Sequence, residues 1–167
     1  MNKLITIDGP SASGKGTLAI LLADRLNWKI LDSGALYRAF AYFSISENNE
    51  KLIEESLKKI SFNIVDNSIQ VLFENEDISK HLRSEETAIQ ASKISSLPST
   101  REILLPIQRF FSETCNLIAD GRDMGSVVFP NANLKFFLDA APEVRAKRRH
   151  LELQKSCLLY TSPSPRD

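Results

Sequence analysis

The stretch Leu4–Thr17, which reads LITIDGPSASGKGT, constrains the fold more than any other part of the sequence. A short apolar run ends in Asp8, a loop of small residues follows, and leucines then recur at the period of a helix. Strand, glycine-rich loop and helix form the context that a phosphate-binding loop requires. Backbone N–H groups can converge there on an anion, and the helix N-terminus adds a positive dipole end. The alternative is a glycine-rich turn that merely connects the strand to the helix.

The loop also has the side chains that phosphate chemistry needs. Lys15 can reach the outer phosphates of a nucleotide, and the Thr17 hydroxyl can bind Mg²⁺. The strict pattern places Ser or Thr directly after the lysine, whereas Gly16 intervenes here, as it does in nucleoside monophosphate kinases. The predicted phosphate-binding residues are Gly9, Pro10, Ser11, Ala12, Ser13, Gly14, Lys15, Gly16 and Thr17.

Composition indicates one ordinary globular domain. The chain has 167 residues, 43% hydrophobic and 25% charged, with a formal net charge of zero. We therefore expect no nucleic-acid polymer and no membrane as partner, and a monomer acting on small molecules. The apolar run from Leu4 is too short for a secretory signal, and Cys115 and Cys157 have no metal or redox spacing, so we expect a cytoplasmic protein.

Three further apolar segments, 28–31, 116–120 and 134–138, are predicted strands that end next to polar residues. Strands that alternate with helical segments predict an α/β fold with three layers, α/β/α, around a parallel sheet. The strand at 134–138 is expected to be buried. Ligand groups of such a sheet lie at the carboxyl ends of its strands.

A change of periodicity marks an insertion. Apolar residues alternate in 62–64 and again in 69–73, with Asp66, Asn67 and Ser68 between them, which predicts a β-hairpin. A local antiparallel hairpin inside a βα chain indicates an inserted α+β subdomain. Ser84 is expected to cap the helix that follows, and Ser99 the next one.

Polar residues at strand ends are the candidates for the site. Asp120 ends an apolar strand, which is the pattern of a magnesium-holding acid, although a plain turn residue fits as well. Arg122 and Asp123 follow it directly. Ser33 and Arg38 can face one crevice, but from spacing alone Arg38 fits a solvated helix residue slightly better.

The predicted helix that begins near Pro142 has a dense basic cluster. In a phosphate-transferring protein such a helix can serve as a lid that lowers guanidinium groups onto the moving phosphoryl. A solvated basic face is the alternative. The cluster contains Arg145, Lys147, Arg148, Arg149 and His150.

With these residues in view, the chain resembles the bacterial cytidylate kinase family over about residues 1–155. The resemblance rests on GPSASGKGT, LDSGALYR, LIADGRDMGSVVFP and FFLDAAPEVRAKRR. It implies ATP-dependent phosphorylation of CMP or dCMP to the diphosphate, with ATP in the loop and Mg²⁺ near Thr17. It also implies a monophosphate-binding insert at about 61–97 and the start of a lid at about 145–155.

The same resemblance implies roles for single residues. Lys15, Asp120, Arg122 and Arg148 would be catalytic, with Asp120 or Asp32 approaching the metal through water. Ser33, Arg38 and Arg122 would bind the acceptor phosphate. Ser92, Arg101 and Asp123 would read the base, because cytosine offers an amine donor where uracil would present a carbonyl to the Asp123 carboxylate.

Other functions stay open at this point. One is a P-loop kinase for another small acceptor, such as AMP, UMP or shikimate. Another is a non-catalytic nucleotide-binding module or a GTPase-like switch, although the sequence contains no guanine-reading Asn-Lys-x-Asp string.

The end of the sequence departs from the family. Residues 156–167 match nothing in its pattern, and we expect a non-native tail on a chain whose gene is longer. The incomplete lid and sheet that this implies predict a weak or inactive kinase.

Overall fold

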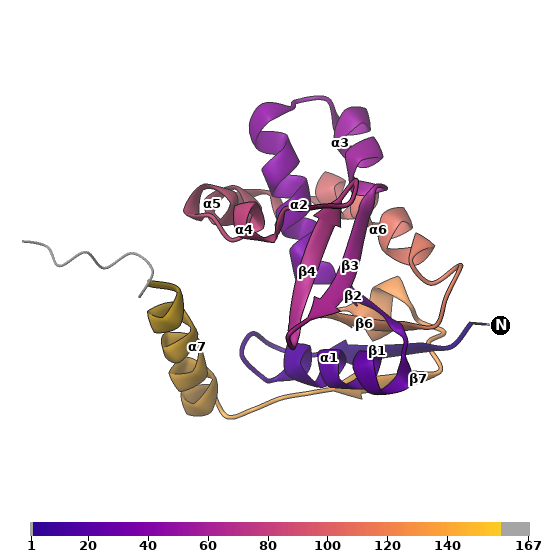
Figure 1. Cartoon of the computed structure of the whole chain (residues 1–167), viewed down its shortest axis with the longest axis vertical. Coiled ribbons are helices and arrows are strands. Elements are labelled where there is room, and N and C mark those ends of the chain that lie inside the picture. The colour runs from indigo at the N-terminus through magenta and orange to yellow at the C-terminus, as the bar shows by residue number, and fades with distance from the viewer. Residues whose placement is uncertain (1, 158–167) are drawn as a thin grey trace, which may run out of the picture.

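A computed structural model of the chain describes residues 2–157, and the predicted tail at 156–167 therefore lies almost wholly outside the described residues. Four parallel strands form the central sheet in the order β2-β6-β1-β7 (Figure 1). Their bounds are β1 Leu4–Asp8, β2 Lys29–Asp32, β6 Leu117–Gly121 and β7 Leu134–Phe137. The register places Asp32 beside Asp120, so two carboxylates meet at the carboxyl edge of the sheet.

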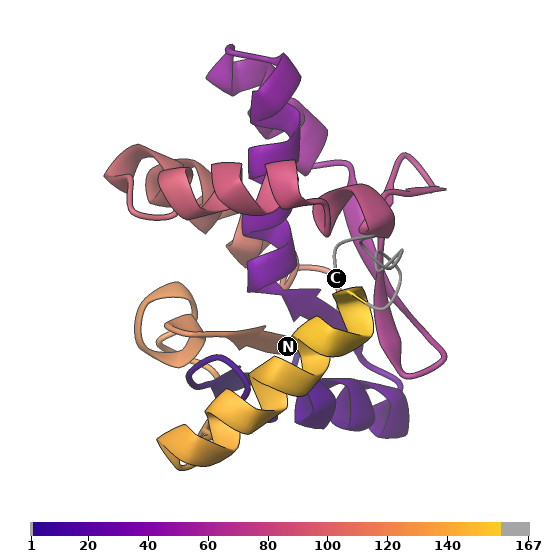
Figure 2. The ribbon, with the colours of Figure 1, turned by 90° about the vertical axis from the view of Figure 1, so that its left-hand side faces the viewer.

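Helices cover both faces of the sheet. In Figure 2, α1 lies on one side of the sheet and the π-helical turn η1 on the other. This confirms the predicted three-layer α/β fold. The helices outside the insert are α1 Lys15–Leu26, α2 Ser33–Ser46, α3 Glu50–Leu57, α6 Pro98–Phe110, η1 Met124–Val128 and α7 Pro142–Cys157.

The predicted insertion is a hairpin followed by short helices. Asp66 and Asn67 connect its two long strands with φ values of 48° and 56°, the left-handed conformation that a two-residue hairpin turn needs. Ser84 caps α5 as predicted, because its hydroxyl accepts a bond from the Thr87 N–H at 3.2 Å. The elements are β3 Ile60–Val65, β4 Ser68–Phe73, β5 Glu76–Asp77, α4 Ser79–Leu82 and α5 Glu85–Ile94.

Two local predictions are wrong. The sequence predicts a buried strand at 134–138, yet every residue of β7 is exposed, with Phe137 at 71%. The reason is position, because among residues 2–157 β7 pairs with β1 alone and so forms an edge of the sheet. Ser99 does not cap α6: the helix begins at Pro98, a residue suited to the first helical position because it lacks the N–H.

The core lies between the sheet and the helices. The inner strands β1 and β6 and the start of α2 supply side chains that are wholly buried, among them Ile7, Leu36 and Ile118. On α1, Ala19 and Ala23 are buried. Partly exposed side chains of this helix also pack against the core, namely Leu18, Ile20 and Leu22. Within residues 2–157, no helix combines the length and apolar character needed to cross a membrane.

Candidate active site

The predicted phosphate-binding loop connects β1 to α1 at the carboxyl edge of the sheet. Ala12 and Gly14 have positive φ values of 60° and 97°, which turn the backbone in the sense needed to enclose an anion. Gly9 lies so close to the Leu138 carbonyl that a side chain at position 9 would clash with it. The backbone of the loop therefore has the curved conformation of an anion-binding loop. A turn that merely connects β1 to α1 would not need this conformation.

Lys15 and Asp120 face each other across the mouth of this loop. The Lys15 Nζ lies 3.8 Å from the Asp120 Oδ1, and this buried oxygen accepts no hydrogen bond from the described residues. Burial raises the pKa of Asp120 to about 7; Lys15 opposes the rise, while Asp32 and Asp8 add to it. Lys15 therefore compensates the charge of the carboxylate only in part, and a further cation would stabilise it.

The glycine that separates Lys15 from Thr17 has a structural reason. A Cβ at Gly16 would lie 3.3 Å from the Asp120 Oδ2, so a side chain at this position would press on the buried carboxylate. The departure from the strict loop pattern therefore makes room for Asp120 to approach the loop.

The residues at this position fit Mg²⁺, which they would bind together with the phosphates of a nucleotide. Mg²⁺ commonly binds through one or two carboxylates together with phosphate oxygens and waters. The orphaned Asp120 oxygen and the exposed Thr17 hydroxyl offer such a partial set. Within residues 2–157, no group of three or more His, Cys, Asp or Glu side chains could hold a metal alone, so the phosphates would have to supply the other ligands.

A cavity of about 280 Å³ joins the loop to the insert. Asp32, Asp120 and Gly16 line it on the sheet side, and Asn67 and Ser68 line it from the hairpin tip. The hairpin tip lies close to the start of α1 (Figure 1).

Arg38 lines the same cavity, whereas Ser33, the other candidate for one crevice, is not among the residues that line it. Arg83, which follows α4, also lines it, and nothing in its sequence context indicated this.

A second cluster forms around Tyr37 of α2. The guanidinium of Arg101 from α6 and the carboxylate of Asp123 both act electrostatically on the Tyr37 hydroxyl. Burial raises the pKa of Tyr37, Arg101 lowers it and Asp123 raises it. Two predicted base-reading residues, Arg101 and Asp123, thus both influence Tyr37, which was not a predicted site residue. Tyr37 precedes Arg38 in LDSGALYR, but nothing in this segment distinguishes Tyr37 as a functional residue.

Ser33 is buried at the start of α2 and has a buried partner. Its Oγ accepts a hydrogen bond from the Gln108 Nε2 at 2.9 Å. Because this bond uses an acceptor position, the Ser33 O–H remains available to donate to an anion. Gln108 was missed because a lone glutamine within the apolar stripe of α6 gives no functional signal.

Two further predicted site residues, Ser92 and Arg122, are exposed. Ser92 lies on α5, and its carbonyl accepts a hydrogen bond from the Ser95 hydroxyl at 3.2 Å. Arg122 is exposed directly after β6.

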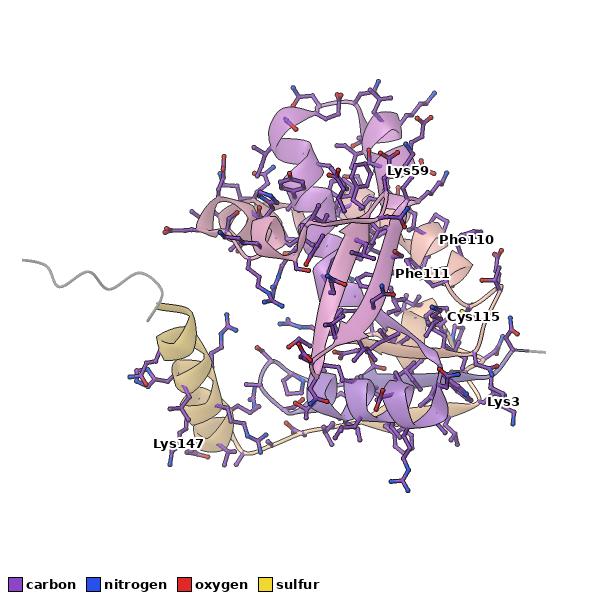
Figure 3. The ribbon with its side chains drawn as sticks, in the orientation of Figure 1. Lys3, Lys59, Phe110, Phe111, Cys115 and Lys147 are labelled. Atoms are coloured by element: carbon purple, nitrogen blue, oxygen red, sulfur yellow. The ribbon has the colours of Figure 1, made fainter. Side chains whose placement is uncertain are left out.

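The basic helix α7 lies beside the phosphate-binding loop (Figures 1 and 2). The Arg148 Nη1 donates to the carbonyls of Ala12 and Ser13 at 3.3 and 3.2 Å. Lys147 points away from the loop (Figure 3), and Arg145 donates to the Ala140 carbonyl at 3.1 Å. Arg148 is therefore a member of the predicted basic cluster that contacts the loop.

The sheet, the phosphate-binding loop and the inserted hairpin are those of a P-loop nucleoside monophosphate kinase. The chain belongs to the cytidylate kinase family, whose model matches residues 5–161. It is 48% identical over 161 residues to a cytidylate kinase of Photobacterium profundum, an alignment that covers 93% of this chain and 71% of the relative. A cytidylate kinase of Aeromonas salmonicida is 49% identical over 160 residues, with coverages of 92% and 70%.

The matched range passes residue 155 by six residues. The predicted boundaries of the insert, the lid and the tail are not otherwise tested and stay predictions.

Proposed function

We propose that this chain transfers the γ-phosphoryl group of ATP to CMP or dCMP, yielding ADP and CDP or dCDP. The observation that carries the proposal is the cavity that Gly16 and Asp120 of the donor side line together with Arg38 and the hairpin tip. Lys15 lies next to this cavity's Asp120, with its Nζ 3.8 Å from the Asp120 Oδ1. The relatives named cytidylate kinase support the choice of acceptor. The chain's partners in this proposal are the two nucleotides, and it acts as a monomer in the cytoplasm.

On the donor side, the phosphates of ATP lie in the loop from Gly9 to Thr17. Lys15 contacts the outer phosphates and neutralises part of their charge. Thr17 and Asp120, with Asp32 nearby, would hold Mg²⁺, which supplies further charge neutralisation on the phosphates when bound. Arg148 would leave the Ala12 and Ser13 carbonyls for the phosphate oxygens, which are stronger acceptors.

On the acceptor side, Ser33, Arg38 and Arg122 hold the monophosphate. One of its oxygens attacks the γ-phosphorus in line, while the bond from that phosphorus to the β–γ bridging oxygen breaks. No covalent intermediate on the protein is needed, because positioning and electrostatic stabilisation provide the rate. Arg101 and Asp123, next to Tyr37, read the base, with Ser92 as the third predicted reader.

A coupled assay of ADP formation tests the proposal with ATP, Mg²⁺ and one acceptor at a time. We expect slow turnover with CMP and dCMP, in keeping with the weak activity that the sequence predicts, and far less with UMP, AMP or shikimate. Asp123→Asn should lower kcat/KM for CMP by about 10- to 100-fold, since a charge-assisted bond to the cytosine amine contributes about 1.5–3 kcal/mol.

Two results would contradict the proposal. If the chain phosphorylated another acceptor faster than CMP and dCMP, it would be a P-loop kinase of different specificity. Binding of a non-hydrolysable ATP analogue without turnover of any acceptor would leave a nucleotide-binding module.

A further inference from the structure

Asp8 connects the phosphate-binding loop with the segment that carries Arg122 and Asp123. It is the last residue of β1 and directly precedes Gly9. Its carboxylate is buried, with the residue 8% exposed. The Oδ1 accepts the Met124 N–H at 2.7 Å, and the Oδ2 accepts the Gly125 N–H at 2.8 Å. Both carboxylate oxygens of Asp8 therefore accept hydrogen bonds from backbone N–H groups of η1.

These two bonds replace a cap that η1 does not provide for itself. Asp123 occupies the N-cap position, where an aspartate side chain usually accepts a bond from the first turn, yet it makes no such bond. Asp8 supplies the acceptors from the neighbouring strand. The Asp123 carboxylate is thus free of the capping role, and its charge acts on the Tyr37 hydroxyl.

Close packing holds the first turn of η1 against β1. A Cβ at Gly125 would lie 2.7 Å from the Thr6 Oγ1 and 3.2 Å from the Asp8 Oδ2. The Leu138 N–H also donates to the Asp8 carbonyl at 2.7 Å. Asp8 thus lies where the donor loop, the Arg122–Asp123 segment and the chain leading to α7 meet.

We propose that Asp8 is a positioning residue that sets the acceptor segment relative to the donor loop. It acts through the backbone of Met124 and Gly125, and it touches neither nucleotide. The assignment rests on the proposed function, in which Arg122 and Asp123 bind the acceptor nucleotide. Because in-line transfer depends on the distance between acceptor and donor, a small shift of η1 should reduce the rate strongly.

Asp8→Asn tests the assignment, because asparagine keeps the shape but can accept only one of the two bonds. We expect kcat/KM for CMP to fall about 10- to 100-fold, as misplacement of reacting groups by about 1 Å does elsewhere. The KM for CMP should rise, kcat should fall and the preference for CMP over UMP should narrow, while the KM for ATP stays near that of the unmodified chain. Amide hydrogen exchange at Met124 and Gly125 should become faster.

Asn133→Ala is the matched control. The Asn133 Oδ1 accepts the Leu4 N–H at 2.8 Å at the opposite end of β1, so this variant also loses a side-chain acceptor for a backbone N–H, but far from the loop. It should lower stability and leave the CMP parameters unchanged. Gly125→Ala is a second test variant: it pushes the same turn away from β1 with the Asp8 carboxylate intact, and should reproduce the pattern of Asp8→Asn.

Asp8 would be a merely structural residue if Asp8→Asn lowered stability yet kept the CMP parameters and acceptor preference of Asn133→Ala. Unchanged amide exchange at Met124 and Gly125 would also overturn the assignment. If the unmodified chain neither binds nor phosphorylates CMP, the proposed function fails, and the exchange measurement still decides whether Asp8 anchors η1.

Discussion

At the scale of single residues, burial decides how Asp120 behaves. Its carboxyl group has a pKa of about 7 in the fold against an ordinary value of 3.8, because burial outweighs the attraction of Lys15. Folding therefore favours the protonated form. The stability that this form contributes is complete below about pH 4 and is lost as the pH rises through 7.

Asp120→Asn should accordingly stabilise the nucleotide-free chain at pH 8. Asparagine stays neutral, so the variant should gain up to about 4 kcal/mol in the free energy of unfolding at pH 8 and little near pH 4. Urea unfolding at several pH values measures this gain, and CMP kinase activity should fall in the same variant. A gain that was largest at pH 4 would show that burial does not penalise the Asp120 charge.

Asp77→Asn serves as a control of opposite sign. Asp77 is exposed, and its pKa is lowered to about 2, chiefly by a hydrogen bond with Ser79 and then by one with Gln70. Folding favours its charged form, so its contribution is present above the ordinary pKa and is lost as the pH falls towards 2. The substitution should therefore destabilise the chain at neutral pH.

The buried Gln108 gives a second prediction at this scale. In Gln108→Glu, the new carboxylate would accept the Ser33 O–H and turn that donor away from the acceptor phosphate. We expect the KM for CMP to rise about 10-fold, since the loss of about 1.4 kcal/mol of binding has that effect, with the KM for ATP nearly unchanged. Steady-state kinetics with each substrate varied in turn measures both constants.

Gln90→Glu is the matched control. The Gln90 Nε2 donates to the Ser44 Oγ at 3.2 Å, so the same pair of groups, a glutamine amide and a serine hydroxyl, occurs between α5 and α2. Its CMP kinetics should stay unchanged. An equal rise of the KM for CMP in both variants would argue against a specific role for Gln108.

At the scale of elements, β7 differs most from the other strands. It forms one edge of the sheet, and Leu134, Phe136 and Phe137 are 53%, 45% and 71% exposed. An edge strand with apolar side chains is a template for pairing with another chain, because its outer backbone groups have no strand partner.

Phe137→Lys should therefore reduce self-association, since a lysine on an edge strand opposes pairing. Light scattering against protein concentration measures this directly. Val65→Lys is the control, because Val65 is an exposed apolar residue, 47% accessible, at the tip of the hairpin. If both substitutions reduced scattering equally, general hydrophobicity and not the β7 edge would be the cause.

At the scale of the whole molecule, the predicted site is assembled from segments far apart in the sequence. The cavity takes its walls from α1, α2, the hairpin and the end of β6. The contacts around Tyr37 add α6 and the turn after β6, and Arg148 brings α7 to the loop. A shift of any one layer would alter both the donor and the acceptor side.

Part of the fold and of the predicted site could be predicted from the sequence, because it depends on residues that are neighbours in the chain. The phosphate-binding loop, the strand ending in Asp120 and the left-handed turn at Asp66 and Asn67 each depend on residues adjacent in the sequence. Their backbone preferences and periodicities are therefore expressed wherever the segment lies. The parallel sheet followed from the alternation of strands and helices.

The remaining features depend on which side chains meet across the fold. Only the tertiary structure brings Gln108 to Ser33 and directs the Asp8 carboxylate to η1, over separations of 75 and 116 residues. It also places β7 at an exposed edge, although its sequence is as apolar as that of an inner strand. The sequence by itself determined the chemistry of the phosphate-binding loop, because that chemistry is local; packing between distant elements decided which other residues can serve it.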